Sequence, residues 1–179
     1  HVLDMSVIHA IRNTIATTDQ HPKWGKIEGM NFLKSEVRIS RAFVLEDEMD
    51  HATRTFLVSL KTEVGTITMR TIPENRATVS LFLENCKDYY ASPPGGCSFY
   101  RAEPGSLLMG GECSDPQHRM PSSIKVKPPE FHDDWQNFPG SVTVTGEDMA
   151  NEYFFFNVKD NSDWIKRAVV ATVETGWDV

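Results

Sequence analysis

The chain has 179 residues and a net charge of −7 at pH 7, with 40% hydrophobic and 24% charged residues. These proportions are typical of a globular domain that buries enough surface to fold without a metal or a disulfide. The negative charge argues against nucleic acid and anionic membrane surfaces as partners, and no apolar run approaches the roughly 20 residues of a membrane span.

The first predicted element is a helix from Asp4 to Thr17. Asp4 can cap its N-terminus, and Pro22 lies shortly beyond its end. Apolar residues recur at helical spacing on one face: Val7, Ile8, Ile11 and Ile15. Because the opposite face is polar, we expect this helix to pack on a sheet.

A long extended segment is predicted from Lys26 to Leu45. Its apolar residues alternate: Val37, Ile39, Phe43 and Leu45. Arg41 falls on the same face, where an unpaired buried guanidinium would cost several kcal/mol. We favour a bulge at Ser40–Arg41 that shifts the register. The alternative is an inward Arg41 that binds a carboxylate or a ligand anion.

Two-residue alternation continues from Thr53 to Leu83, with one apolar face and one face rich in Thr and Ser. We interpret this stretch as an antiparallel meander with one buried face. The predicted strands and turns are, in chain order, 53–61, Val64–Gly65, 66–72, Pro73–Arg76 and 77–83. The acidic segment Glu46–His51 before the meander is expected to be a solvated connection, with a hard-cation site as the alternative.

The pattern breaks down from Asn85 to Phe138, where Gly and Pro recur. Short extended pieces are predicted at 98–101, 106–109 and 124–127. Long irregular segments within a compact domain are often functional. This one is rich in aromatic residues: Phe99, Tyr100, Phe131 and Trp135. His132 lies beside two carboxylates, although a loop anchored by its aromatic neighbours is the interpretation that we prefer.

Regular patterns return near the C-terminus. Strands are predicted at Ser141–Thr145 and Glu152–Val158, and the apolar run Tyr153–Phe156 predicts a central strand covered on both sides. The segment Asp163–Val173 is either a helix or a turn followed by a strand. We favour the strand, because residues 168–173 are rich in β-branched side chains.

The three cysteines, Cys86, Cys97 and Cys113, match no zinc-binding pattern. Cys97 and Cys113 flank a Gly/Pro-rich stretch, so they are the expected pair if the compartment is oxidising. An extracellular or surface location is slightly favoured over the cytoplasm. Because no nucleophile, phosphate-binding or metal motif occurs, we assign no catalytic residue, no metal ligand and no cofactor.

The expected fold is mainly β: an antiparallel sandwich or strongly curved sheet with the N-terminal helix packed on it. The alternative is an α+β helix-on-sheet fold of the hot-dog, cystatin or nuclear-transport-factor kind. Residues 37–48 resemble a strand of hot-dog dehydratase domains, but the catalytic His-x-x-x-Gly-x-x-x-x-Pro motif of that family is absent. No family is assigned. Residues 1–179 are expected to form one domain of a larger or processed protein.

The leading functional hypothesis is a non-enzymatic binding module that uses the aromatic region 89–138 to recognise a protein or a small molecule. Its expected ligand-binding residues are Arg41, Phe99, Tyr100, Phe131, His132 and Trp135. A second hypothesis is a small isomerase, hydro-lyase or cyclase with a pocket between helix and sheet, lined by Arg41 and a His. A third is a structural module of a capsid or surface assembly, and the sequence is compatible with an oligomer.

Overall fold

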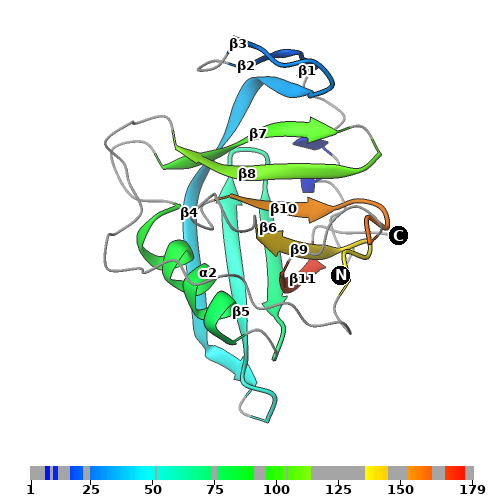
Figure 1. Cartoon of the computed structure of the whole chain (residues 1–179). Coiled ribbons are helices and arrows are strands. Elements are labelled where there is room, and N and C mark those ends of the chain that lie inside the picture. The colour runs from blue at the N-terminus through cyan, green and yellow to red at the C-terminus, as the bar shows by residue number, and fades with distance from the viewer. Residues whose placement is uncertain are drawn as a thin grey trace.

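The computed structural model is a closed antiparallel β-barrel with one complete helix among the residues that it describes (Figure 1). These are residues 7–8, 10–11, 17–21, 25–50, 52–73, 76–90, 96–103, 105–113, 136–144, 153–162 and 168–175. The first elements are β1 (Thr17–Thr18), β2 (Gln20–His21), β3 (Gly25–Lys26), β4 (Phe32–Asp50), β5 (Thr55–Thr62) and β6 (Thr66–Thr71). They are followed by α2 (Arg76–Asp88), β7 (Cys97–Glu103), β8 (Leu107–Cys113), β9 (Ser141–Val144), β10 (Phe154–Asn157) and β11 (Val169–Thr175).

The barrel closes through β4. The strand order is β4-β5-β6-β11-β9-β10-β8-β7, and β7 pairs back with β4. The first part of β4 pairs with β7, where Val37 lies opposite Phe99, and the later part pairs with β5. The prediction of a mainly antiparallel β fold with a helix is confirmed. The sheet closes on itself, however, so it is a barrel and not a two-layer sandwich.

A register shift between Ile39 and Arg41 confirms the predicted bulge. Ile39 is buried before the shift, and after it Ala42 and Val44 pack against the core. Arg41 is exposed. Because the bulge reverses the alternation, Phe43 is only half-buried, and the Lys61 ammonium lies 5.6 Å from its ring centroid.

The first two strands of the predicted meander are confirmed as β5 and β6, but the third is wrong. Residues 77–83 belong to the helix α2. Their alternation is also compatible with a helical period, because Val79, Phe82 and Cys86 share one helix face and are buried in the core. Pro73 lies between the end of β6 at Thr71 and the start of α2 at Arg76, and proline cannot donate a backbone hydrogen bond to continue a strand.

The remaining strands agree with the predicted pieces, which the structure extends. The pieces at 98–101 and 106–109 become β7 and β8, and β9 and β10 lie within the predicted C-terminal strands. β11 confirms the strand interpretation of residues 168–173. The predicted piece at 124–127 and residues 163–167 lie outside the described residues.

Aromatic rings fill the interior. Phe154 packs against Phe99 at 5.8 Å between ring centroids, against Phe82 at 6.1 Å and against Tyr90 at 4.9 Å. Every residue of β10 is buried, which confirms the prediction of a strand covered on both sides. No helix in the described part of the chain is long and apolar enough to cross a membrane.

The N-terminal residues belong to the same core. The four described residues between 7 and 11 are helical, and Val7, Ile8 and Ile11 are buried. A Cβ at Gly65 would overlap with the Val7 side chain, so this segment lies at the barrel end that carries the β5–β6 turn. The predicted helix therefore packs into the barrel core. The predicted C-terminal end of that helix is wrong, because Thr17 belongs to β1, and residues 4–6, 9 and 12–16 lie outside the described residues.

Gly110 lies between two rings of the core. A Cβ there would come within 2.9 Å of both Phe99 and Phe154. We expect Gly110→Ala to lower the free energy of unfolding by about 1–3 kcal/mol, because the rings cannot move without straining their neighbours. Urea denaturation measures the loss. If the clash is the cause, Gly110→Ala with Phe99→Leu should lose less than the two single variants together, and additive losses would contradict it.

Candidate functional site

A second apolar cluster, here called the outer cluster, lies outside the barrel core. Its buried members are Phe32, Tyr100, Leu107, Met109 and Phe155, with Ile27, Met30 and Tyr153 packed against them. The cluster results from strand alternation: Phe99, Leu108 and Phe154 belong to the core, while the residues next to them belong to the outer cluster. Three neighbouring strands, β7, β8 and β10, therefore present apolar side chains on both faces.

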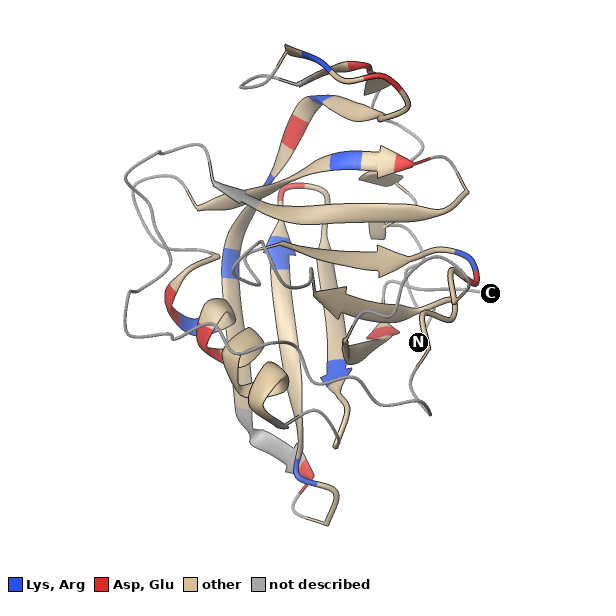
Figure 2. Cartoon of the chain, viewed as in Figure 1, with Lys and Arg blue, Asp and Glu red and all other residues tan. Residues whose placement is uncertain are grey.

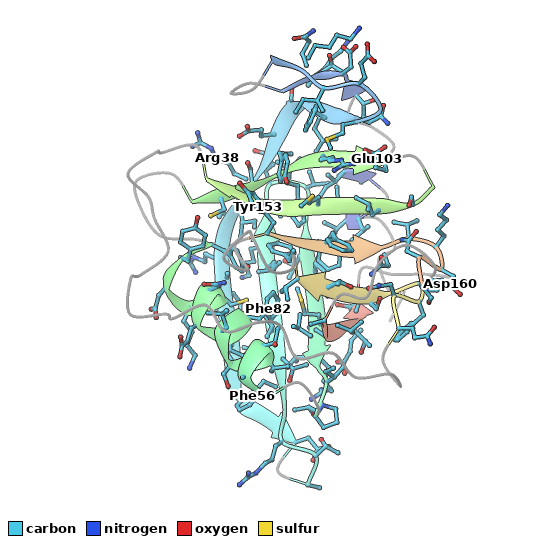
Figure 3. All side chains as sticks on the ribbon, in the orientation of Figure 1. Arg38, Phe56, Phe82, Glu103, Tyr153 and Asp160 are labelled. Carbon is cyan, nitrogen blue, oxygen red and sulfur yellow. The ribbon has the colours of Figure 1, made fainter. Side chains whose placement is uncertain are left out.

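Aromatic stacking organises the outer cluster. The rings of Phe32 and Tyr100 are stacked, with centroids 6.4 Å apart and planes inclined by 18°. Tyr100 also contacts Tyr153, with centroids 5.7 Å apart. Tyr153 is half-buried and precedes β10 directly, where it is labelled in Figure 3. Its ring gives the cluster a part that solvent can reach.

The chain covers the outer cluster with its own segment Gly25–Asn31, here called the strap. Ile27 and Met30 of the strap pack against the cluster and are each half-buried. Figure 1 places β3, where the strap begins, on the β7 side of the barrel. The apolar outer wall is thus shielded by a few residues that precede β4.

Polar groups at the end of β7 fix one end of the strap. The Glu103 carboxylate accepts hydrogen bonds from the Asn31 amide Nδ2 at 2.7 Å and the Asn31 backbone N–H at 3.1 Å. It also pairs with Arg101 at 2.8 Å, and Ala102 N–H donates to the Asn31 carbonyl at 2.9 Å. The Arg101 and Glu103 side chains are only 18% and 13% exposed. Glu103 is labelled in Figure 3.

Charge is scarce along the neighbouring strands. β9 and β10 contain no Lys, Arg, Asp or Glu, and both are tan throughout in Figure 2. The outer cluster is therefore a buried apolar cluster, and the polar side chains of Arg101, Glu103 and Asn31 lie beside it.

The structure separates the residues that we expected to bind ligand. Tyr100 lies in the outer cluster, whereas Phe99 is fully buried in the core. Arg41 is exposed on β4 and does not belong to the outer cluster, so its side chain does not line an enclosed pocket. The other three expected residues, Phe131, His132 and Trp135, lie outside the described residues.

Sequence reasoning missed most of the outer cluster. Its strand residues Leu107, Met109 and Phe155 lie in runs that are apolar at every position, not at alternate ones. Such runs indicate strands covered on both faces. The signal was available, but the local pattern does not say what covers the second face.

The acidic segment Glu46–Asp50 forms the end of β4, and not a connection. Asp50 accepts hydrogen bonds from the backbone N–H groups of Ala52 at 2.9 Å and Thr53 at 3.3 Å. The Thr53 side chain and these two N–H groups lower the pKa of Asp50. Among the described residues, no group of three His, Cys, Asp or Glu is placed to hold a metal ion.

Asp50→Asn should destabilise the protein in a pH-dependent way. Because folding lowers the pKa of Asp50, its contribution is present above the unfolded-state pKa of about 3.9 and is lost as the pH falls through the folded value. We expect the variant to melt at a lower temperature than wild type at pH 7, and the difference to disappear as the pH falls through the folded-state pKa of Asp50. Glu63→Gln, in the exposed β5–β6 turn, is the control. A difference independent of pH would contradict this role.

Neutral polar side chains form a buried network between β9, β10 and the residues beside them. The Asn157 amide donates to the hydroxyls of Ser141 and Thr143, at 2.9 Å each, and accepts from Asn161 at 2.9 Å. Thr143 in turn donates to Asn137 at 2.7 Å. These residues cannot exchange protons near neutral pH, so the network joins strands and does not supply an acid or a base.

The cysteines differ in state. Cys97 is disulfide-bonded, and the backbone register of the β7–β8 ladder places Cys113 opposite it. Cys86 is a free, fully buried thiol, and burial raises its pKa well above the usual range. These facts agree with the expected bond between Cys97 and Cys113. A buried thiol with a raised pKa is a poor nucleophile.

Peptide mapping tests the cysteine assignment. Cleavage after Lys87 and Arg101 places the three cysteines on separate peptides. Without reduction, we expect mass spectrometry to find the Cys97 and Cys113 peptides linked and Cys86 alkylated only after unfolding. The Cys86→Ser variant should keep the linked pair. A link that includes Cys86 would contradict the assignment.

Comparisons with protein-family models, with curated proteins and with solved structures find no match to this chain. The site therefore has to be interpreted from its own geometry.

Proposed function

We propose that this domain is a non-enzymatic recognition module that binds a segment of another protein at the outer cluster. The observation that carries the proposal is the apolar outer wall of β7, β8 and β10, which is separate from the core. A barrel needs apolar residues only inside to fold, and its outer wall is ordinarily polar. An apolar patch of this kind is characteristic of a protein interaction site when it is exposed; here Ile27 and Met30 of the strap pack against it.

The composition of the patch supports a protein ligand. Tyr, Phe, Met and Arg are enriched in protein interfaces; the outer cluster contains the first three types, and Arg101 lies beside it. The barrel holds Tyr100, Leu107 and Phe155 on three paired strands, so the surface is rigid before a ligand arrives. A preorganised surface loses little conformational entropy on binding.

The proposed site includes part of the region 89–138 that we expected from the sequence to bind the ligand, because β7 and β8 lie within that region. We also assign ligand contacts to Phe131, His132 and Trp135, which follow β8 in the sequence. A disulfide at Cys97 supports an extracellular or surface location, because such bonds persist in oxidising compartments.

Tyr153→Ala tests the proposal, because this half-buried ring is the accessible aromatic residue of the outer cluster. Peptides selected from a displayed random dodecapeptide library against the wild-type domain would be titrated by fluorescence anisotropy. We expect the variant to bind them about tenfold or more weakly, as for the loss of an aromatic anchor.

Phe43→Ala is the matched control. Phe43 is also a half-buried aromatic residue on a barrel strand, but it does not belong to the outer cluster. Its removal should leave peptide affinity unchanged, and circular dichroism would verify that both variants fold. Equal affinity of Tyr153→Ala and wild type, or an equal loss in both variants, would refute the proposed site.

A further inference from the structure

The strap is held at its base by pairing with the barrel. β1 pairs with the start of β4, and Thr18 lies opposite Phe32. The chain therefore leaves the barrel after Thr18 and returns to the adjacent position at Phe32, and the strap Gly25–Asn31 lies within this closed loop. A loop whose ends are joined can change its position while the strands at its base stay paired.

Two glycines set the path of the strap. Gly25 has φ +73° and Gly29 has φ +78°, a conformation that other residues rarely adopt. No atom lies within 4 Å of a Cβ built at either position. These glycines are therefore required by the backbone conformation and not by close packing. A substitution there strains the backbone of the strap without creating a steric clash with the barrel.

Among the described residues, few interactions hold the strap against the barrel. Ile27 and Met30 contribute apolar contacts, and Asn31 binds Glu103 through its side chain and N–H and accepts from Ala102 N–H. Within the loop, Ile27 N–H donates to the Asp19 carbonyl at 3.0 Å. The ion pair between Lys26 and Asp19 is 3.2 Å long, but its side chains are 55% and 48% exposed, so it contributes little. A segment with so few buried contacts opens far more readily than the barrel unfolds.

We infer that the strap is an internal pseudo-ligand, which occupies the outer cluster and must be displaced before a partner segment binds. The inference rests on the proposed function, because it assigns a competitor to the same surface. It also names the ligand class. The partner is a protein segment with two apolar side chains three positions apart, as in Ile27 and Met30, followed by a hydrogen-bond donor for Glu103, as in Asn31.

Competition has a quantitative consequence. When only a fraction of the molecules is open, the apparent dissociation constant equals the intrinsic constant divided by that fraction. A change that destabilises the closed strap therefore raises the affinity for the partner without touching the contact surface. A lost ligand contact would have the opposite effect on affinity.

The experiment uses a fluorescein-labelled, capped peptide with the sequence of residues 25–32 as the probe. Gly29→Ala strains the left-handed backbone of the strap and should raise the affinity for this peptide about fivefold or more over wild type. The double variant Ile27→Ser/Met30→Ser removes the apolar anchors of the strap and should raise it further. Anisotropy titration measures both.

Gly105→Ala is the matched control. Gly105 has φ +68°, also has no atom within 4 Å of a built Cβ, and lies in the β7–β8 turn outside the strap. It should leave the affinity unchanged. A second probe with Ser in place of Ile27 and Met30, and a third with Ala in place of Asn31, should each bind the open variants at least about tenfold more weakly.

The outcomes separate this inference from the proposed function. If Gly29→Ala and the double variant bind the peptide no better than wild type, the strap does not compete and the inference is overturned. The same holds if the substituted probes bind as well as the native one. Library peptides that lose affinity in Tyr153→Ala would still support the recognition surface. If Tyr153→Ala binds them as wild type does, the proposed function itself fails.

Discussion

The barrel depends on β4, which pairs with β7 through its first part and with β5 through its later part. Without the β7 pairs the sheet would be open, and the rings inside would face water. The shift between Ile39 and Arg41 keeps apolar side chains inside on both sides of it, with Val37 before and Val44 after. A guanidinium in the middle of an apolar alternation is thus compatible with a dry interior.

The same pairing determines where the outer wall is covered. Because Phe32 lies opposite Arg101 in the β4–β7 ladder, the residues before β4 enter the barrel beside the outward side chains of β7. The sheet there separates two apolar layers, the core and the outer cluster. Only the first is enclosed by the barrel; in the described part of the chain, the strap packs against the second. The β4–β7 pairing therefore both closes the barrel and brings the strap to the proposed recognition surface.

Local sequence patterns predicted most of the strands correctly, but they did not predict that the sheet closes into a barrel. Alternation identified β5 and β6, and the apolar run Tyr153–Phe156 identified a strand covered on both faces. The apolar residues of 77–83 fit both a strand period and a helical period. The segment forms a helix, which buries Val79 and Phe82 in the core. The pairing of β4 with β7 joins distant segments, so no local period reveals it. The outer cluster was missed for the same reason, since Phe32 and Phe155, on β4 and β10, join one cluster only in the closed barrel.

The β4–β7 pairing also affects how the chain reaches its native state. Phe32 pairs with Arg101, although the segment of chain between them contains β5, β6 and α2. Such non-local contacts slow folding, because the chain loses loop entropy before the contacts form. During synthesis the long edge of β4 emerges well before its partner β7. Until β7 has been synthesised, the β4 edge can pair with other chains. The yield of native protein therefore depends on the delay between the synthesis of β4 and that of β7.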